Sequence, residues 1–200
     1  MRQNAPDFQR TSGPPVTLQS IQGNPAAWRQ ASQLNAIIGA IIRYALLAFA
    51  GAPFTVASYL IEGRPSRDYV HTKALMHTDE PLWHRLLDRL ADHAVEFISH
   101  QLTAGASAFQ LFDSWAGALS RADYDRFVLP HSRKVFGALA QRHPDAAGIH
   151  FGIGCGHLLE SMYSAGTTVM GLDWRVPIDE ARRRLGTDTV VQGNLDPALA

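Results

Sequence analysis

The sequence has 200 residues, of which 46% are hydrophobic, and its 18 basic and 18 acidic side chains cancel. A chain of this size can bury a substantial core, which favours one soluble domain. The balanced charge gives no reason to expect a nucleic acid or a membrane surface as a partner. A single cysteine excludes an internal disulfide and fits a reducing compartment, so we expect a cytoplasmic protein.

The N-terminal part differs in composition from the rest of the chain. Proline, glycine, serine, asparagine and glutamine recur there without a clear period, and no apolar signal-peptide core is present. We therefore expect a loosely ordered segment over residues 1–44, followed by a folded region over residues 45–200. The apolar run from Ala36 to Val56 could suggest a membrane span, but it contains Arg43 and Pro53. A helical piece through Ile42 and then a buried strand is the preferred interpretation.

Short apolar segments that end in glycine or polar residues alternate with helical patterns along the folded region. They predict strands near residues 45–50, 108–112, 149–153, 168–172 and 189–192. Such alternation is typical of a parallel α/β fold, and polar groups recur at the strand ends. A complete (β/α)8 barrel takes about 250 residues. The pattern therefore predicts an incomplete (β/α)8 TIM barrel with about five parallel strands and outer helices.

Local signals place the helices between these strands. The most secure helix spans residues 81–104, with Thr78 or Asp79 as its N-cap, Pro81 in its first turn and Gly105 as its stop. Ser66 is a candidate N-cap for a short helix before it. Further helices are predicted from Ser120 with a break at Pro130, from His157 to Ala165, and from Pro177 to Leu185.

The stretch from Ala104 to Gly117 contains a helix stop, a buried strand and a polar tip at Asp113 and Ser114. Ligands of parallel α/β folds bind at the carboxyl ends of the strands, so we expect Asp113 and Ser114 to face a ligand. Ser114 lacks the surroundings of a nucleophilic serine, which favours a hydrogen-bonding contact to a substrate. Tyr59 is either a core aromatic or a hydroxyl that faces the ligand.

Two other groupings have a plain structural interpretation beside a functional one. Gly152, Gly154 and Gly156 follow a strand, but their spacing is not that of a dinucleotide-binding loop, so tight turns are favoured over phosphate binding. Amides at the start of the next helix remain able to hold an anion. His150, Cys155 and His157 are close together but lack a clear third ligand of the same site, so no metal site is predicted.

Six motifs, taken in order, resemble the uroporphyrinogen decarboxylase family over about Leu46 to Ala200. They are Phe49-Ala-Gly-Ala-Pro-Phe-Thr55, Ser58-Tyr-Leu-Ile-Glu-Gly63, Gln110-Leu-Phe-Asp-Ser-Trp-Ala-Gly117, Val128-Leu-Pro-His131, Gly171-Leu-Asp-Trp174 and Gln192-Gly-Asn-Leu-Asp-Pro197. Their joint occurrence is specific to the family. In this resemblance Tyr59 matches a substrate-contacting tyrosine and Ser114 matches a substrate-contacting serine.

The resemblance implies a (β/α)8 barrel and a carboxy-lyase of haem biosynthesis. Such an enzyme converts uroporphyrinogen III to coproporphyrinogen III by decarboxylating the acetate side chains. A protonated pyrrole ring accepts the electrons, so the resemblance implies no cofactor. It further implies a small-molecule substrate, a cytoplasmic location and a homodimer of the complete enzyme.

Several family motifs are missing from this sequence. The Phe-Ser-Asp motif, whose aspartate is central to catalysis, is absent, and the C-terminal histidine motif would lie beyond Ala200. Only Met1-Arg2-Gln3 resembles the start of the arginine-rich motif, and Arg64 stands where a glycine is commoner. No catalytic residue is therefore assigned, and we expect a truncated or rearranged gene product with little activity.

Two alternatives stay open beside the decarboxylase. A zinc-dependent corrinoid or thiol methyltransferase of the same superfamily would carry a His-x-Cys pair where this chain has His150 and Cys155, at a different spacing. A non-catalytic fragment that folds poorly, or only with a partner, is the second alternative.

Overall fold

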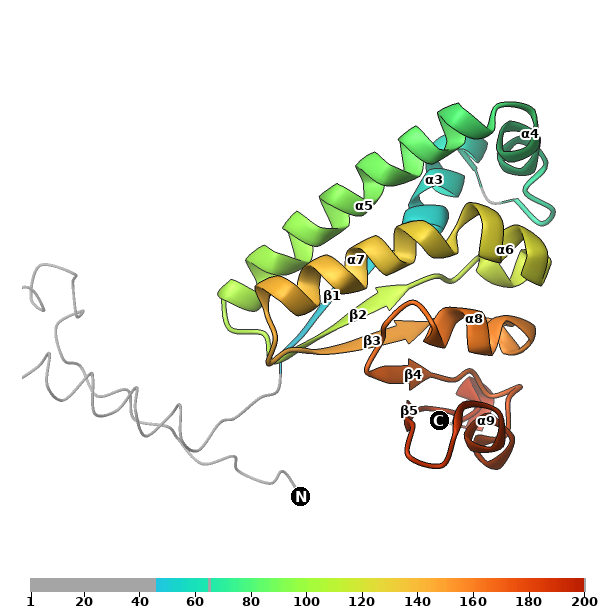
Figure 1. The fold of residues 1–200 in the computed structure, drawn as a ribbon. Helices are drawn as coiled ribbons and strands as arrows, with labels where there is room; N and C mark the ends of the chain where they lie inside the picture. The colour runs from blue at the N-terminus through green and yellow to red at the C-terminus, as the bar shows by residue number, and fades with distance from the viewer. Residues whose placement is uncertain (1–45, 65, 200) are drawn as a thin grey trace, which may run out of the picture. The chain divides into compact units, whose positions relative to one another are not determined.

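One parallel sheet organises the described part of the chain, which in this computed structural model comprises residues 46–64 and 66–199 (Figure 1). The expected loose segment over residues 1–44 and the helical piece through Ile42 lie outside these residues. The strands are β1 (Leu47–Gly51), β2 (Ala108–Phe112), β3 (Ala147–Phe151), β4 (Val169–Gly171) and β5 (Val190–Gln192), hydrogen-bonded in the order β1-β2-β3-β4-β5. The predicted strands, their parallel pairing and their adjacency are confirmed, with ends shifted by one or two positions.

The two faces of the sheet differ in composition because side chains alternate along each strand. Register aligns Ala50 with Leu111, Leu111 with His150, and His150 with Met170, all buried beneath the helices. The neighbouring positions form the opposite face, where Phe112 contacts Phe49 and Phe151 at ring-centroid distances of 6.2 and 5.9 Å. Phe49 is 57% exposed, so the face of the sheet that points away from the helices is only partly covered within the described residues.

The helices begin and end at local signals that the sequence carries. Their bounds are α3 (Pro53–Glu62), α4 (Val70–Thr78), α5 (Glu80–Thr103), α6 (Arg121–Phe127), α7 (Leu129–Arg142), α8 (Leu159–Tyr163) and α9 (Ile178–Leu185). Asp79 Oδ1 accepts a hydrogen bond from the Leu82 amide, which confirms the predicted start of α5. Ser120 caps α6 in the same way, and the predicted break near Pro130 separates α6 from α7.

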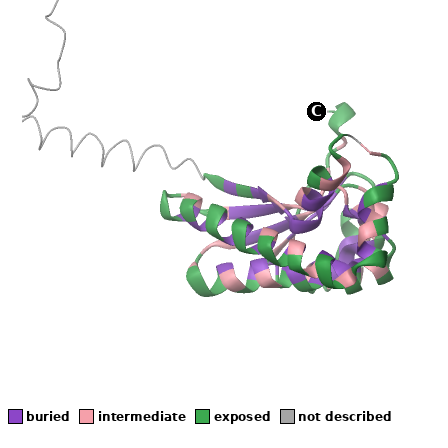
Figure 2. Cartoon of the chain, turned by 90° about the horizontal axis from the view of Figure 1, so that it is seen from above, coloured by how far each residue is buried: buried purple, intermediate pink, exposed green. Residues whose placement is uncertain are grey.

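Helices α5 and α7 lie side by side over one face of the sheet (Figure 1). Figure 2 shows their buried positions facing the sheet and their exposed positions facing outward. Buried side chains such as Trp83, Ile98 and Leu139 form the core between helices and strands, and Trp83 Nε1 also donates to the Phe127 carbonyl at 2.9 Å. Parallel strands covered by outer helices are the architecture of part of a (β/α)8 barrel, which confirms the predicted fold class.

Helix α3 was not among the helices predicted from the sequence. Pro53 at its first position and Gly63 in the left-handed conformation just after its end were the available signals. The short helix predicted from Ser66 begins later, at Val70, because the Ser66 hydroxyl instead accepts from the Tyr69 amide in the preceding turn. Among the described residues, no helix combines the length and apolar composition needed to cross a membrane.

Candidate functional site at the carboxyl ends of the strands

Ser114 and Tyr59 both lie at the carboxyl edge of the sheet. Ser114 follows β2 after one residue, in a turn, and is half-buried. Tyr59 lies on α3, which starts directly beyond the end of β1, and it is 58% exposed. Tyr59 is therefore not a core aromatic.

The indole ring of Trp115 links these two parts of the chain. Its centroid lies 3.8 Å from that of Tyr59 and 5.2 Å from that of Tyr69. Tyr69 has a φ of 52°, a left-handed conformation that is strained for a bulky side chain. Burial, together with the nearby Tyr59, raises the pKa of Tyr69. The α3–α4 segment thus places two tyrosine rings against the residue that follows Ser114.

Asp113 does not face a ligand, which corrects the expectation for this residue. Its side chain is fully buried, and its Oδ1 accepts a hydrogen bond from the Thr55 hydroxyl at 3.1 Å. The physical reason is the alternation along β2, where Phe109 and Leu111 face the helices and Asp113 shares their parity. Asp113 Oδ2 lies 3.9 Å from the buried His150 Nε2.

A pocket of about 380 Å³ opens beyond the ends of β3, β4 and β5. Its lining includes Phe151, Trp174, Arg175 and Asn194. The Arg175 guanidinium lies over the Trp174 ring at 4.4 Å and bonds the buried Asp173 at 2.8 Å. Sequence reasoning missed Arg175, although its place just beyond a predicted strand end was a usable signal. The pocket therefore presents the positive charge of Arg175 beside apolar side chains such as Phe151.

The glycines after β3 serve tight turns and close approaches, as expected. Gly154 has a φ of +66°, and its amide donates to Asp173 Oδ2 at 2.6 Å. A Cβ on Gly152 would lie 2.5 Å from the sulfur of Cys155. A Cβ on Gly117, in the turn after β2, would lie 2.5 Å from the carbonyl oxygen of Ile153. The turns after β2 and β3 therefore touch backbone to backbone.

His150, Cys155 and His157 have separate partners. His150 Nδ1 lies 3.2 Å from the Met162 carbonyl oxygen, and His157 Nε2 lies 2.8 Å from that of Leu119. Burial, with the carboxylates of Asp113 and Asp173 nearby, raises the pKa of the Cys155 thiol far above its usual value. Within residues 46–64 and 66–199, no group of three or more histidine, cysteine or acidic side chains is placed to hold a metal ion.

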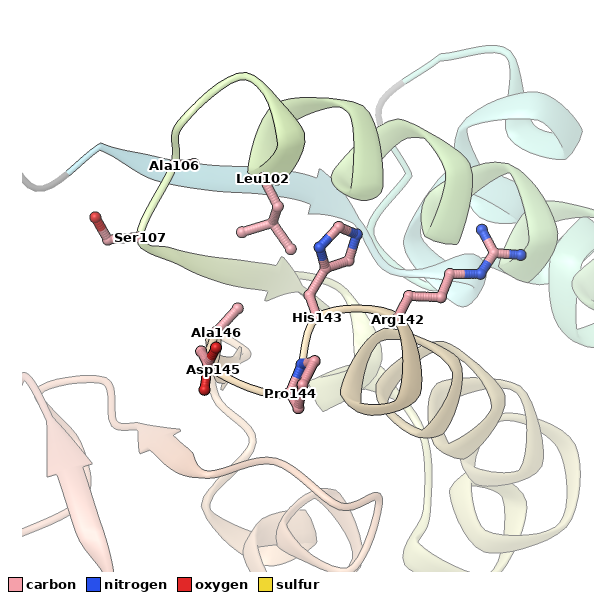
Figure 3. Close-up of a pocket in the computed structure, with 8 residues that line it drawn as sticks. All are labelled: Leu102, Ala106, Ser107, Arg142, His143, Pro144, Asp145 and Ala146. Atoms are coloured by element: carbon pink, nitrogen blue, oxygen red, sulfur yellow. The ribbon is translucent and has the colours of Figure 1, made fainter.

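A second pocket, of about 350 Å³, lies at the opposite edge of the sheet (Figure 3). Its walls come from the end of α5 and from the loops that lead into β2 and β3, and include Leu102, Ser107, His143 and Asp145. Active sites of parallel barrels lie at the carboxyl ends of the strands. The pocket in Figure 3 is therefore set apart from the candidate site.

The family model described as uroporphyrinogen decarboxylase matches residues 33–200, which include every element of the candidate site. The chain belongs to the uroporphyrinogen decarboxylase family. The match begins ahead of Leu46, where the resemblance in the sequence motifs began.

Curated relatives in this family carry the same name. A uroporphyrinogen decarboxylase of Saccharopolyspora erythraea is 59% identical over 163 residues, which cover 77% of this chain and 45% of the relative. One of Streptomyces coelicolor is 60% identical over 154 residues, covering 77% and 43%. One of Salinispora tropica is 55% identical over 163 residues, covering 82% and 43%. The chain thus spans less than half the length of these relatives.

Proposed function

We propose that this chain supplies part of the substrate cleft of a uroporphyrinogen decarboxylase, with Tyr59 and Ser114 as substrate contacts. One observation carries the proposal: the exposed Tyr59 packs against Trp115, the residue after Ser114, at the strand edge where barrel enzymes bind their ligands. Membership of the uroporphyrinogen decarboxylase family supports the choice of substrate.

The proposed reaction removes carboxyl groups from the acetate arms of uroporphyrinogen. Protonation of a pyrrole ring makes it an electron sink, the bond between the arm's methylene and its carboxyl carbon breaks, and CO₂ leaves. A proton then adds to the methylene carbon and the ring releases the proton that it had taken up, which turns the arm into a methyl group on a neutral pyrrole. The protein's task is to hold the polyanion in a preorganised cleft and to orient the pyrrole nitrogens.

The side chains at the strand edge suit the binding part of this task. The hydroxyls of Tyr59 and Ser114 can donate hydrogen bonds to carboxylates, each worth about 1.5–3 kcal/mol. Arg175 offers charge-assisted donors beside the apolar wall of the 380 Å³ pocket. No residue of the chain matches the family's catalytic aspartate motif, so binding is proposed here and efficient turnover is not.

Three further expectations stay predictions that belong to the complete enzyme: a homodimer, a cytoplasmic location and no nucleic-acid partner. The small-molecule substrate follows from the proposed reaction itself. The second candidate, a zinc-dependent methyltransferase, is less favoured because the thiol of Cys155 is buried among carboxylates and His150 faces the Met162 carbonyl. Measurement of bound zinc in the purified chain tests it directly.

The test of the proposal is binding and turnover of uroporphyrinogen under anaerobic conditions. Affinity is measured by titration calorimetry, and turnover by chromatography of the porphyrins after oxidation. We expect measurable binding that Ser114→Ala and Tyr59→Phe each weaken by about tenfold or more. Decarboxylation should stay far below that of a complete relative.

Matched controls remove the same chemical groups elsewhere in the fold. Ser107→Ala removes an exposed hydroxyl at the opposite end of β2, and Tyr163→Phe removes a phenol hydroxyl on α8. Neither should change the affinity. Equal losses in the controls would refute the site, and full conversion to coproporphyrin by this chain alone would refute the importance given to the missing aspartate.

A further inference from the structure

Two hydrogen bonds of the Thr55 hydroxyl connect α3 to the turn after β2, and we call this pair of bonds the joint. The hydroxyl donates to Asp113 Oδ1 at 3.1 Å and lies 3.5 Å from the Trp115 amide, which donates to it. A hydroxyl has one proton and two acceptor lone pairs, so it can make both bonds at once. Thr55 is 4% exposed and Asp113 is fully buried, so water does not compete at this joint.

The two residues that bond the Thr55 hydroxyl flank Ser114 in the sequence. They are Asp113 and Trp115, so both ends of this tripeptide are tied to one atom of α3. Tyr59 lies one helical turn beyond Thr55 on α3 and packs on the Trp115 ring. The positions of the two proposed substrate contacts, Ser114 and Tyr59, thus both depend on the buried hydroxyl of Thr55.

We propose that Thr55 and Asp113 are positioning residues that hold the hydroxyls of Ser114 and Tyr59 in a fixed relation at the substrate cleft. The inference rests on the proposed function, because it takes those two hydroxyls as the contacts to the porphyrinogen. Neither Thr55 nor Asp113 touches the substrate. A displacement of about 1 Å at such contacts is enough to lower activity strongly, and the buried joint prevents such a displacement.

The remaining carboxylate oxygen of Asp113 suggests a control variant. Among the described residues, Asp113 Oδ2 and His150 Nε2 are both buried without a hydrogen-bond partner. His150 Nδ1 faces the Met162 carbonyl and must carry the ring proton to bond it, which makes Nε2 an acceptor in the neutral ring. Asp113→Asn keeps Oδ1 for Thr55 and turns an N–H toward His150, so it preserves the joint.

The test is a comparison of Thr55→Val, which removes the hydroxyl at constant shape, with Thr55→Ser and Asp113→Asn, which keep the joint. Thr55→Val should weaken uroporphyrinogen binding by about tenfold, and the other two by less than about threefold. In a Ser114→Ala, Tyr59→Phe background, Thr55→Val should cause no further loss, since its effect passes through those hydroxyls. An additive loss would show a merely structural role and overturn the proposal.

A second readout works without substrate. The Trp115 amide donates to Thr55, so hydrogen exchange in a peptide covering residues 113–119 should accelerate by about tenfold in Thr55→Val and hardly change in Thr55→Ser. Leu139→Ala, which destabilises the core away from the joint, controls for general loosening and should leave this peptide no faster than the others. If Thr55→Val changes neither the hydrogen exchange nor the affinity, the positioning role of Thr55 is refuted. If Thr55→Val accelerates the exchange as expected but the wild type does not bind uroporphyrinogen, only the proposed function is refuted.

Discussion

The phenol ring of Tyr59 packs on the indole ring of Trp115, with their centroids 3.8 Å apart and their planes inclined by 45°. These residues come from α3 and from the turn after β2, so the contact joins two segments that are far apart in the sequence. Aromatic pairs of this kind contribute about 0.5–1.5 kcal/mol beyond their buried area. The contact places the exposed Tyr59 against the residue that follows Ser114.

Replacement of Arg175 tests whether the 380 Å³ pocket takes a carboxylate. Arg175→Gln should weaken uroporphyrinogen binding by about tenfold and reduce its dependence on salt, because a charge-assisted contact is lost. Titration calorimetry at two salt concentrations measures both effects. Arg183→Gln, at an arginine of α9 whose side chain is 73% exposed, is the control and should change neither. Equal effects of the two variants would mean that only the net charge matters.

Gly117 tests the contact between the turns after β2 and β3. A Cβ there would lie 2.5 Å from the Ile153 carbonyl oxygen, so Gly117→Ala must push the two turns apart. We expect it to lower the free energy of unfolding by about 1–3 kcal/mol, measured by urea denaturation. Gly137→Ala has the opposite expectation, a gain of about 0.5–1 kcal/mol, because Gly137 lies within α7 with open space around its Cβ position. A neutral Gly117→Ala would contradict the close contact.

Gln101 covers the edge of β1 that faces away from β2. Its side-chain amide accepts from the Phe49 N–H at 3.1 Å and donates to the Phe49 carbonyl at 3.1 Å, as a neighbouring strand would. Gln101→Met should therefore expose an unpaired strand edge and increase self-association, measured by light scattering. Gln141→Met, at an exposed position of α7, adds the same apolar side chain without uncovering an edge. Equal self-association of both variants would argue against the capping role.

The buried His131 should make the free energy of unfolding depend on pH. Burial, and then the adjacent His84, lower its pKa to about 4 in the folded chain, from 6.5, and the two rings approach to 2.8 Å between His84 Nδ1 and His131 Nε2. Asp88, which favours the charged ring, and Lys134, which opposes it, also act on His131. Between pH 6.5 and 4 the unfolded chain binds the proton more readily, so stability is full above pH 6.5 and falls as the pH drops toward 4.

The corresponding experiment compares unfolding at a series of pH values. His131→Gln should flatten the loss of stability in this window, which amounts to at most about 3 kcal/mol. His100→Gln, at an exposed histidine near the end of α5, should leave the curve unchanged. A curve for His131→Gln that coincides with the wild type would mean that other groups cause the pH dependence.

The secondary structure was largely predictable because its signals are local. Apolar runs of about five residues, the caps at Asp79 and Ser120, and the break near Pro130 each act within one turn or one strand. Helix α3 was missed although Pro53 and Gly63 mark its two ends. The family motifs also lie within short segments, which is why the sequence alone identified the family that the comparisons show.

The orientation of the side chains at the strand ends was decided only by the tertiary structure. Asp113 and Ser114 are neighbours in a polar tip, yet register with β3 and the hydroxyl of Thr55 draw Asp113 into the buried layer and leave Ser114 at the edge. Tyr59 likewise depends on a distant partner, Trp115, whereas Arg175 bonds the buried Asp173 only two residues before it. The sequence determined which segments form strands and helices, because propensity and capping are local. Only packing between distant segments decided which polar side chains are buried and which lie at the carboxyl edge of the sheet, because a buried polar group such as Asp113 finds its hydrogen-bond partner, Thr55, across the fold.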